Sequence, residues 1–218
     1  MSVSTSPSAE KDAAGTRRPA AAGRVRWRVV DIVVAAVLGV ALGLVFWGWN
    51  TVGYAWFVAM DALTPGLGGL AAGIWLLAGV VGGLIIRNPG AALLVEVIAA
   101  VVSMLIGNVW GVSTLFSGIV QGLGAELILL AFLYLRFTLP VAMLAGAAAG
   151  AAAWVFEFFY GSSPNILKTL EFNLIYLGSL LVSGAILAGV VGWLLVRALA
   201  ATGALSRFAA GRELRRDV

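Results

Sequence analysis

Apolar residues run almost without interruption from Val29 to Val196, broken by clusters of Gly, Pro, Asn and Arg. A bilayer core about 30 Å thick needs a helix of about 20 apolar residues. Cutting the chain at those clusters gives six such segments, so the pattern predicts an all-α membrane protein with six transmembrane helices. We place them near residues 29–49, 67–86, 90–108, 114–135, 138–160 and 165–196.

Two stretches depart from this regular pattern. Residues 51–66 contain Asp61 and end in Thr-Pro-Gly, which we interpret as a short interfacial or re-entrant helix. The last apolar segment is too long for one straight crossing, so we expect it to tilt, bend or project beyond the bilayer.

The two ends of the chain differ from the apolar centre. Residues 1–23 are rich in Ser, Ala, Thr and Pro and hold too little apolar sequence for a core, so we expect a disordered cytoplasmic tail. They lack an apolar run before a small-residue cleavage site, so we expect no secretory signal. Residues 24–200 form the predicted transmembrane domain, and residues 201–218 a basic cytoplasmic tail.

Composition narrows the chemistry. A mean hydropathy of +1.03 with 61% hydrophobic and 11% charged residues is outside the range of soluble domains. The chain has no His and no Cys, which excludes zinc sites built on them, disulfides and Ser-His triads. Neither Lys11 nor Lys168 follows glycine, so there is no Walker A motif and ATP hydrolysis would need another subunit. We expect no enzyme activity, no cofactor, no metal and no nucleic-acid partner.

The cations orient the predicted bundle. With both termini cytoplasmic, Lys168 alone falls outside, and one span more or fewer would move roughly half of the cations to the wrong side. This topology gathers polar and aromatic residues near the outer face, where we look for a substrate. They are Trp47, Trp49, Asn50, Tyr54, Asn108, Trp110, Trp154, Glu157, Tyr160, Asn165 and Asn173.

Helical spacing brings some of these residues together. Trp154, Glu157 and Tyr160 follow at i, i+3 and i+6, so an acid lies between two aromatic rings, which suits an organic cation. An interfacial aromatic belt with a solvated glutamate has the same spacing, and both interpretations stay open. A second stripe of Asn165, Thr169, Asn173 and Tyr176 should face the bundle, either toward a ligand or in hydrogen bonds between helices.

Two further carboxylates lie inside apolar segments, where a charge is costly without a partner, water or ligand. Glu96 shares a helix face with Ser103, about 9 Å from the cytoplasmic start of its segment. A structural role is favoured for it, with ligand contact or proton carriage as alternatives. Gln121 and Glu126 lie among glycines but point about 140° apart, so one of them is expected to bind substrate and the other a helix.

An ordered set of motifs resembles the YkoE family, substrate-binding S components of energy-coupling factor (ECF) transporters associated with thiamine and hydroxymethylpyrimidine. It comprises residues 86–92 (IRNPGAA), Glu96, Gly107-Asn108, residues 121–126 (QGLGAE) and residues 139–146 (LPVAMLAG), and the likeness extends over most of residues 27–216. The resemblance implies a six-helix S component in a prokaryotic plasma membrane. Such a protein captures a vitamin from outside and works with a transmembrane coupling protein and two ATPases.

The resemblance also assigns roles. The rings of thiamine would be enclosed by Trp47, Trp110, Trp154 and Tyr160. The pyrimidine would be bound by Asn108, Asn173 and Gln121, and the thiazolium charge would be balanced by Glu157. The expected site is completed by Asn50 and Glu126. The family often has an acidic residue where this chain has Ser103, so Glu157, Glu126 and the tryptophans are expected to bind the cationic part of the ligand instead. Ala35, Ala36, Gly39 and Gly43 resemble the small-residue surface by which S components dock on their coupling protein.

Other functions remain as alternatives. A proton-coupled secondary transporter of a small heterocyclic or cationic substrate would use Glu96 or Glu126 as its proton carrier. A membrane enzyme lacks a recognisable nucleophile and base in this sequence. A purely structural scaffold would have no reason to collect amides and tryptophans at one end.

Overall fold

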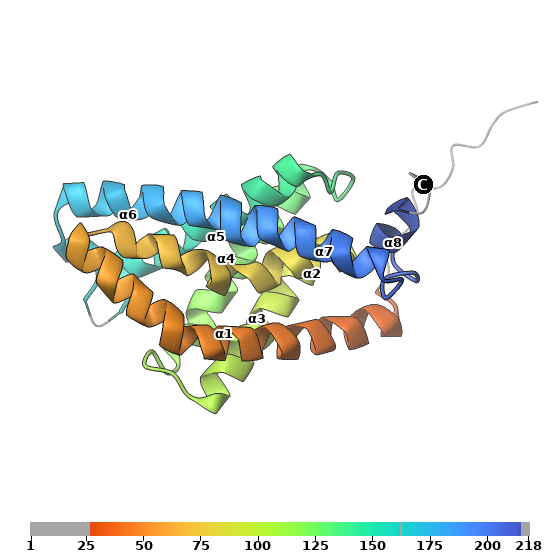
Figure 1. The fold of residues 1–218 in the computed structure, drawn as a ribbon, viewed down its shortest axis with the longest axis horizontal. Helices are drawn as coiled ribbons and strands as arrows, with labels where there is room; N and C mark the ends of the chain where they lie inside the picture. The colour runs from red at the N-terminus through yellow and green to blue at the C-terminus, as the bar shows by residue number, and fades with distance from the viewer. Residues whose placement is uncertain (1–26, 162, 215–218) are drawn as a thin grey trace, which may run out of the picture.

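The computed structural model describes residues 27–161 and 163–214, and all regular structure within them is helical (Figure 1). The predicted tail at residues 1–23 and residues 215–218 lie outside the described residues. In the described part, five helices are long and apolar enough to cross a membrane, and the apolar helix α3 (Ala91–Ile106) is shorter. Together they are the six segments that the sequence predicts.

The first helix, α1 (Val29–Leu63), is longer than expected and changes direction part-way along (Figure 1). It continues through residues 51–63, so the prediction of a separate interfacial or re-entrant helix there is wrong. No proline interrupts the helix between Val29 and Leu63, and α1 ends at Leu63, two residues before Pro65. Gly66 then takes a φ of 99°, and its N–H donates to the Asp61 carboxylate at 2.7 Å.

The second span lies at the centre of the bundle. It begins as a 3₁₀ helix, η1 (Leu67–Leu76), and continues as α2 (Leu77–Ile86), which matches the predicted range. Glycines let its backbone approach its neighbours. A Cβ at Gly73 would lie 2.3 Å from the carbonyl oxygen of Ser183, and one at Gly82 would lie 2.6 Å from Cβ of Val95.

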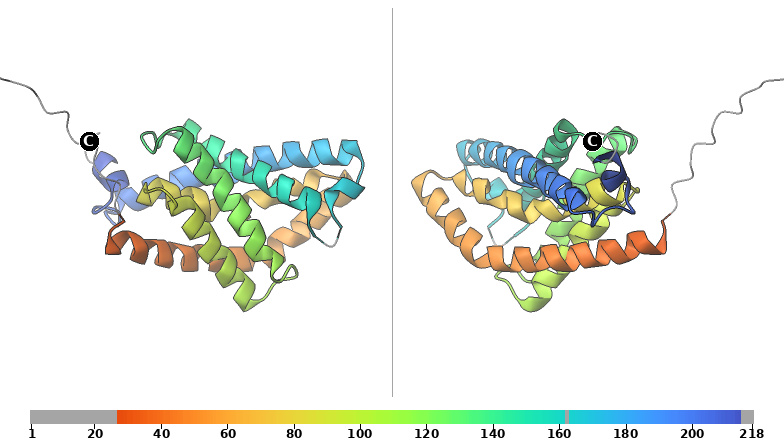
Figure 2. Two further views of the ribbon diagram at one scale, coloured as in Figure 1. Left: turned by 180° about the vertical axis from the view of Figure 1, so that it is seen from behind. Right: turned by 45° about the vertical axis from the view of Figure 1, so that its right-hand side comes forward.

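The next three helices are α3, α4 (Ser113–Ala131) and α5 (Leu139–Phe159). Figure 2 shows α3 and α4 crossing the bundle at an angle to α1 and α6. The α4 helix ends before residue 135, the limit expected from the sequence, because Leu133 and Tyr134 turn the chain with φ values of 53° and 54°.

The last span starts later and runs farther than predicted. A short 3₁₀ turn, η2 (Asn165–Leu167), precedes α6 (Leu170–Ser183), a π-helical stretch η3 (Gly184–Val190) and α7 (Val191–Ala201). A final short helix, α8 (Ala209–Leu214), follows. The expected excess length of this segment is therefore present as one continuous helical run from α6 to α7.

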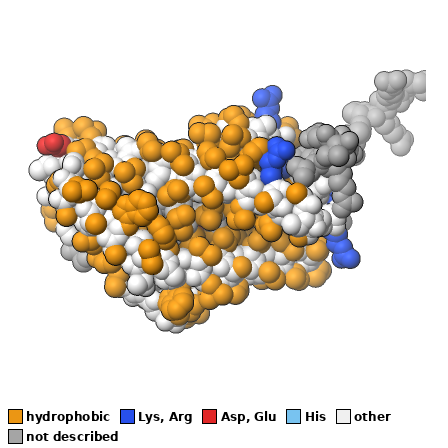
Figure 3. Space-filling view, viewed as in Figure 1, with side chains coloured by type: hydrophobic (Ala, Val, Ile, Leu, Met, Phe, Trp, Pro, Cys, Tyr) orange, Lys and Arg blue, Asp and Glu red, His pale blue; other side chains and the backbone are white. Residues whose placement is uncertain are grey.

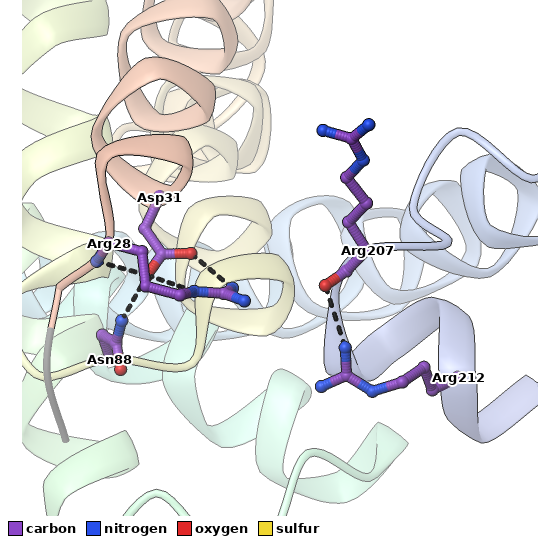
Figure 4. A network of polar contacts seen from close by, with 5 residues as sticks. All are labelled: Arg28, Asp31, Asn88, Arg207 and Arg212. Carbon is purple, nitrogen blue, oxygen red and sulfur yellow. Dashed lines mark hydrogen bonds and ion pairs between the residues drawn. The ribbon is translucent and has the colours of Figure 1, made fainter. Parts of the chain in front are cut away.

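Both ends of the described chain lie at one end of the bundle (Figure 1), and arginine side chains, blue in Figure 3, gather toward the same end. We call this the basic end. Figure 4 shows its polar network: Arg28 forms a 2.7 Å ion pair with Asp31, and the amide of Asn88 donates to the same carboxylate at 3.0 Å. These bonds fasten the start of α1 to the turn between α2 and α3. The hydrogen bond and charge of Asp31 raise the pKa of the exposed Arg28 guanidinium.

Candidate functional site

A cavity of about 680 Å³ lies between the helices and is bordered by the loops at the end opposite the basic end. We call that opening the mouth. One stripe of α1 lines the cavity, with Phe46, Asn50, Tyr54 and Phe57 at helical spacing. Tyr54 and Phe57 belong to residues 51–63, which the sequence pattern did not predict as part of the first membrane helix, so the length of α1 completes this wall.

Four other helices, α3, α4, α5 and α6, each contribute a stripe of the same kind. Successive turns of a helix present residues three or four positions apart to the same side, so one face of each helix reaches the cavity. The stripes are Glu96, Ala100 and Ser103 on α3; Ser113, Ser117 and Gln121 on α4; Ala153 and Glu157 on α5, continued by Tyr160; and Phe172, Tyr176 and Leu180 on α6.

A polar chain crosses the wall between three elements. Trp75 Nε1 of η1 donates to Asn50 Oδ1 at 2.9 Å, and Asn50 Nδ2 donates to Ser103 Oγ at 2.9 Å. The Asn50 amide is therefore held by a donor and an acceptor, which fixes its orientation at the cavity surface. Trp75 was not among the binding residues predicted from the sequence. Its position in the middle of an apolar segment, rather than at a segment end where interfacial tryptophans lie, is the feature that could have indicated it.

Aromatic rings form the wall nearer the mouth. Trp110 makes edge-on contacts with Trp75 and Tyr54, each with ring centroids 5.4 Å apart. Phe57 meets Tyr176 edge-on at 6.2 Å. Such a surface can receive a flat heterocycle by stacking and a cation by its ring faces.

Two carboxylates line the cavity at different depths. Glu157 lies near the end of α5 at the mouth, and its Oε2 accepts a 2.5 Å hydrogen bond from the Tyr176 hydroxyl. Glu96 lies on the inner part of α3 and is 1% exposed. Its Oε2 accepts from Gly79 N at 2.6 Å, whereas its Oε1 is buried and has no hydrogen-bond partner among the described residues.

The structure brings half of the predicted binding residues to this cavity, namely Asn50, Trp110, Gln121, Glu157 and Tyr160. Two predicted amides instead support its rim. Asn108 Oδ1 accepts from Trp110 N and Gly111 N, each at 2.9 Å, and so shapes the loop that carries Trp110. Asn173 Nδ2 donates to the carbonyl oxygens of Asn165 and Thr169 at 2.8 and 3.0 Å, which ties η2 to α6.

Three predicted residues lie elsewhere. Trp47 is 47% exposed on the outer surface of α1, and Trp154 packs beside Phe158 with ring centroids 5.1 Å apart. Glu126 accepts hydrogen bonds from Gly90 N at 2.6 Å and Ala92 N at 2.9 Å, at the start of α3. None of the three is among the residues that line the cavity, so this expectation is corrected: α4 carries Glu126 to the start of α3, and Trp154 packs against the cluster of Ala72, Phe172, Tyr176 and Leu180.

Tyr134 completes the environment of Glu126. Its hydroxyl donates to Glu126 Oε1, and burial together with this bond raises the pKa of Tyr134 well above its ordinary value. The carboxylate thus satisfies free N–H groups at the N-terminus of a helix, where negative charge is favourable. This is a structural role at the basic end.

The expected docking stripe is also corrected. Ala35, Gly39 and Gly43 are buried inside the chain against α3, and Ala36 alone of the four is exposed. A Cβ at Gly39 would lie 2.5 Å from Cβ of Ile98. The small residues allow α1 and α3 to approach each other closely, which explains their helical spacing without a partner protein.

Comparison with known proteins places this fold. Residues 30–152 match a family described as the ABC-type cobalt transport system, permease component. The chain is 37% identical over 199 residues to YkoE of Bacillus subtilis (strain 168), a protein named as an HMP/thiamine permease, and the match covers 87% of this chain and 93% of that protein. The chain belongs to the YkoE family.

A solved structure agrees with this membership. A crystal structure of an S component of an ECF transporter matches the YkoE-family chain with a TM-score of 0.74 and 34% identity, covering 88% of this chain and 95% of the other. The resemblance found in the motifs is confirmed, and the chain is a multi-pass membrane protein of a transporter family with the S-component fold.

Proposed function

We propose that this chain is the S component of an ATP-driven ECF importer and that it binds thiamine or its hydroxymethylpyrimidine moiety in the cavity. The observation that carries the proposal is the cavity wall itself, where the Asn50, Trp75 and Ser103 chain lies beside aromatic rings and the Glu157 carboxylate. The name of the relative YkoE, an HMP/thiamine permease, supports the same class of substrate.

The chemistry of thiamine matches the residues on this wall. Its aminopyrimidine needs hydrogen-bond donors and acceptors, which Asn50 and Gln121 supply. Its thiazolium cation is attracted by an aromatic face by about 0.5 to 2 kcal/mol and by the nearby Glu157 carboxylate. The described residues contain no group of three or more His, Cys, Asp or Glu that could hold a metal ion, so an organic cation is better supported than cobalt.

The partners are a transmembrane coupling protein and two ATPases. The chain has no Walker A motif, so ATP hydrolysis that drives release would take place in other subunits. Cations gathered at the basic end favour a cytoplasmic location for that end, with the cavity mouth facing outward. The setting is the plasma membrane of a prokaryotic cell.

A proton-coupled transporter is the second candidate, and the unpaired Glu96 Oε1 inside the bundle is the observation that favours it. Proteoliposomes separate the two functions. With this chain alone, we expect labelled thiamine to bind without accumulating, even under a proton gradient, and to accumulate only when the coupling protein, both ATPases and ATP are present. Accumulation by the chain alone would reject the ECF proposal.

A further inference from the structure

We propose that the cavity has two subsites and that Glu96 determines specificity at the inner one, where it accepts a hydrogen bond from an amino group on the ligand ring. Glu157 belongs to the outer subsite, which takes the cationic part of the ligand. This inference rests on the proposed function and adds the orientation of the ligand and the residue that selects it.

The space around Glu96 is made by glycines of two neighbouring helices. A Cβ at Gly79 of α2 would lie 3.2 Å from Glu96 Oε2, and a Cβ at Gly122 of α4 would lie 3.1 Å from Glu96 Cβ. Gly118 borders the same turn of α3, where an added Cβ would lie 3.6 Å from the Glu96 carbonyl oxygen. These glycines let the backbones of α2 and α4 approach α3 closely, so the Glu96 side chain is closely packed between them.

The hydrogen bonds of Glu96 leave one acceptor unused. Oε2 accepts from Gly79 N, an amide in the first turn of α2 that has no acceptor within its own α-helix. Oε1 has no partner among the described residues, although the side chain lines the cavity and is almost fully buried. A buried acceptor left unpaired is unfavourable, so a donor from a ligand would complete this position.

In this proposal Glu96 is ionised when ligand is bound, and an ionised carboxylate only accepts hydrogen bonds, which sets the chemical class of the inner ligand group. An amino substituent offers N–H donors to Oε1, whereas an oxo substituent would present a second oxygen to it. Glu96 and Ser103 lie two turns apart on the same face of α3, so the polar chain formed by Asn50 and Ser103 borders the ligand on the mouth side of Glu96.

The outer subsite has a different character. The Glu157 carboxylate accepts a hydrogen bond from Tyr176. The Lys168 ammonium lies 4.0 Å from the centroid of the Phe172 ring, which shows that a cation can bind over the face of this ring. Asn165 also lines this part of the cavity, and its Nδ2 is buried with no partner among the described residues. The thiazolium of thiamine fits here, while hydroxymethylpyrimidine, which lacks that ring, would fill the inner subsite alone.

Two variants and three ligands test this division. Binding of thiamine, hydroxymethylpyrimidine and the 4-oxo analogue of hydroxymethylpyrimidine is measured by calorimetry on the purified full chain, on Glu96→Gln and on Glu157→Gln. The wild type should bind both amino compounds and prefer them to the oxo analogue by about 100-fold or more, as expected of a site built to pair a ligand N–H. Trp47→Phe changes a residue on the outer surface and serves as the control variant, which should bind all three ligands as the wild type does.

The two variants should respond differently. Glu96→Gln should weaken thiamine and hydroxymethylpyrimidine alike, by roughly 10- to 100-fold, and reduce the preference over the oxo analogue, because a glutamine amide can also donate to an oxo group. Glu157→Gln should weaken thiamine and leave hydroxymethylpyrimidine within about 2-fold.

The outcomes separate the inference from the function on which it rests. Unchanged amino-to-oxo preference in Glu96→Gln, or equal binding of the amino and oxo compounds by the wild type, would overturn the role of Glu96 while the vitamin-binding function stands. The wild-type comparison decides this even if Glu96→Gln fails to fold. Absence of binding of all three ligands to the wild type would overturn the proposed function as well.

Discussion

Tyr176 on α6 donates a 2.5 Å hydrogen bond to Glu157 on α5, at the mouth of the cavity. The two residues lie on different membrane helices, and each belongs to the stripe that its helix contributes to the cavity wall. The bond therefore fixes the orientation of a carboxylate on the path by which a ligand would enter.

Removing the Tyr176 hydroxyl should weaken thiamine binding. Tyr176→Phe keeps the ring but takes a donor from Glu157, so we expect thiamine affinity to fall about 3- to 10-fold, with a smaller change for hydroxymethylpyrimidine. Titration calorimetry on the purified protein measures both. Tyr160→Phe removes a hydroxyl from the same cavity without touching this bond and should have the smaller effect. Equal losses in the two variants would contradict the assigned role.

Lys168 should oppose a cationic ligand. It lines the cavity mouth, so its ammonium repels a positive charge bound beside Glu157. Lys168→Met should raise thiamine affinity about 2- to 5-fold at low salt, lose this gain at high salt and leave hydroxymethylpyrimidine unaffected. Arg207→Met, at the basic end, is the control. Weaker thiamine binding in Lys168→Met would show that the lysine contacts the ligand favourably instead.

The contact between α1 and α3 should tolerate no bulk at Gly39. Because an added Cβ would lie 2.5 Å from Ile98 Cβ, Gly39→Leu should lower the free energy of unfolding by at least about 1 to 3 kcal/mol and reduce folded protein, binding and uptake together. Thermal unfolding followed by tryptophan fluorescence measures the loss. Ala36→Leu, on the exposed side of the same helix, should keep both stability and ligand binding. Full stability in Gly39→Leu would mean that the two helices separate more easily than their packing indicates.

Glu126 should matter for stability and leave ligand binding intact. Glu126→Gln removes the charge that satisfies the N–H groups at the start of α3, so we expect a loss of roughly 1 to 3 kcal/mol in the free energy of unfolding. Thiamine affinity of the folded variant should match that of the wild type, because this carboxylate lies at the basic end. A selective loss of affinity with unchanged melting temperature would return Glu126 to the binding site.

Periodicity and apolar length predicted most of the fold because both follow from local rules. The range 67–86 coincides with η1 and α2, and the spacing of Glu96 with Ser103 gives their shared face correctly. A separate short helix was expected at residues 51–66 because Asp61 and the Thr-Pro-Gly end interrupt the apolar pattern, but α1 continues to Leu63, and its last part supplies Tyr54 and Phe57 to the cavity wall.

Site residues were harder to predict because depth and partner depend on how the helices cross. Trp110 and Asn108 are neighbours in sequence, yet one lines the cavity and the other shapes its loop. Gly39 and Gly43 carry the spacing of a docking surface, but the same spacing serves α3 inside the chain. Small residues report close approach of two helices without saying whether the second helix belongs to the same protein.

The most direct test of the account is the affinity of the purified chain for thiamine in the wild type, in Asn50→Leu and in Trp47→Leu. Asn50 joins Trp75 and Ser103 in the cavity wall, whereas Trp47 lies on the outer surface. Calorimetry should show one thiamine bound per wild-type chain, a loss of at least about 10-fold in Asn50→Leu and unchanged affinity in Trp47→Leu. No binding by the wild type, or equal affinity in all three proteins, would contradict the assignment of this cavity as the vitamin site.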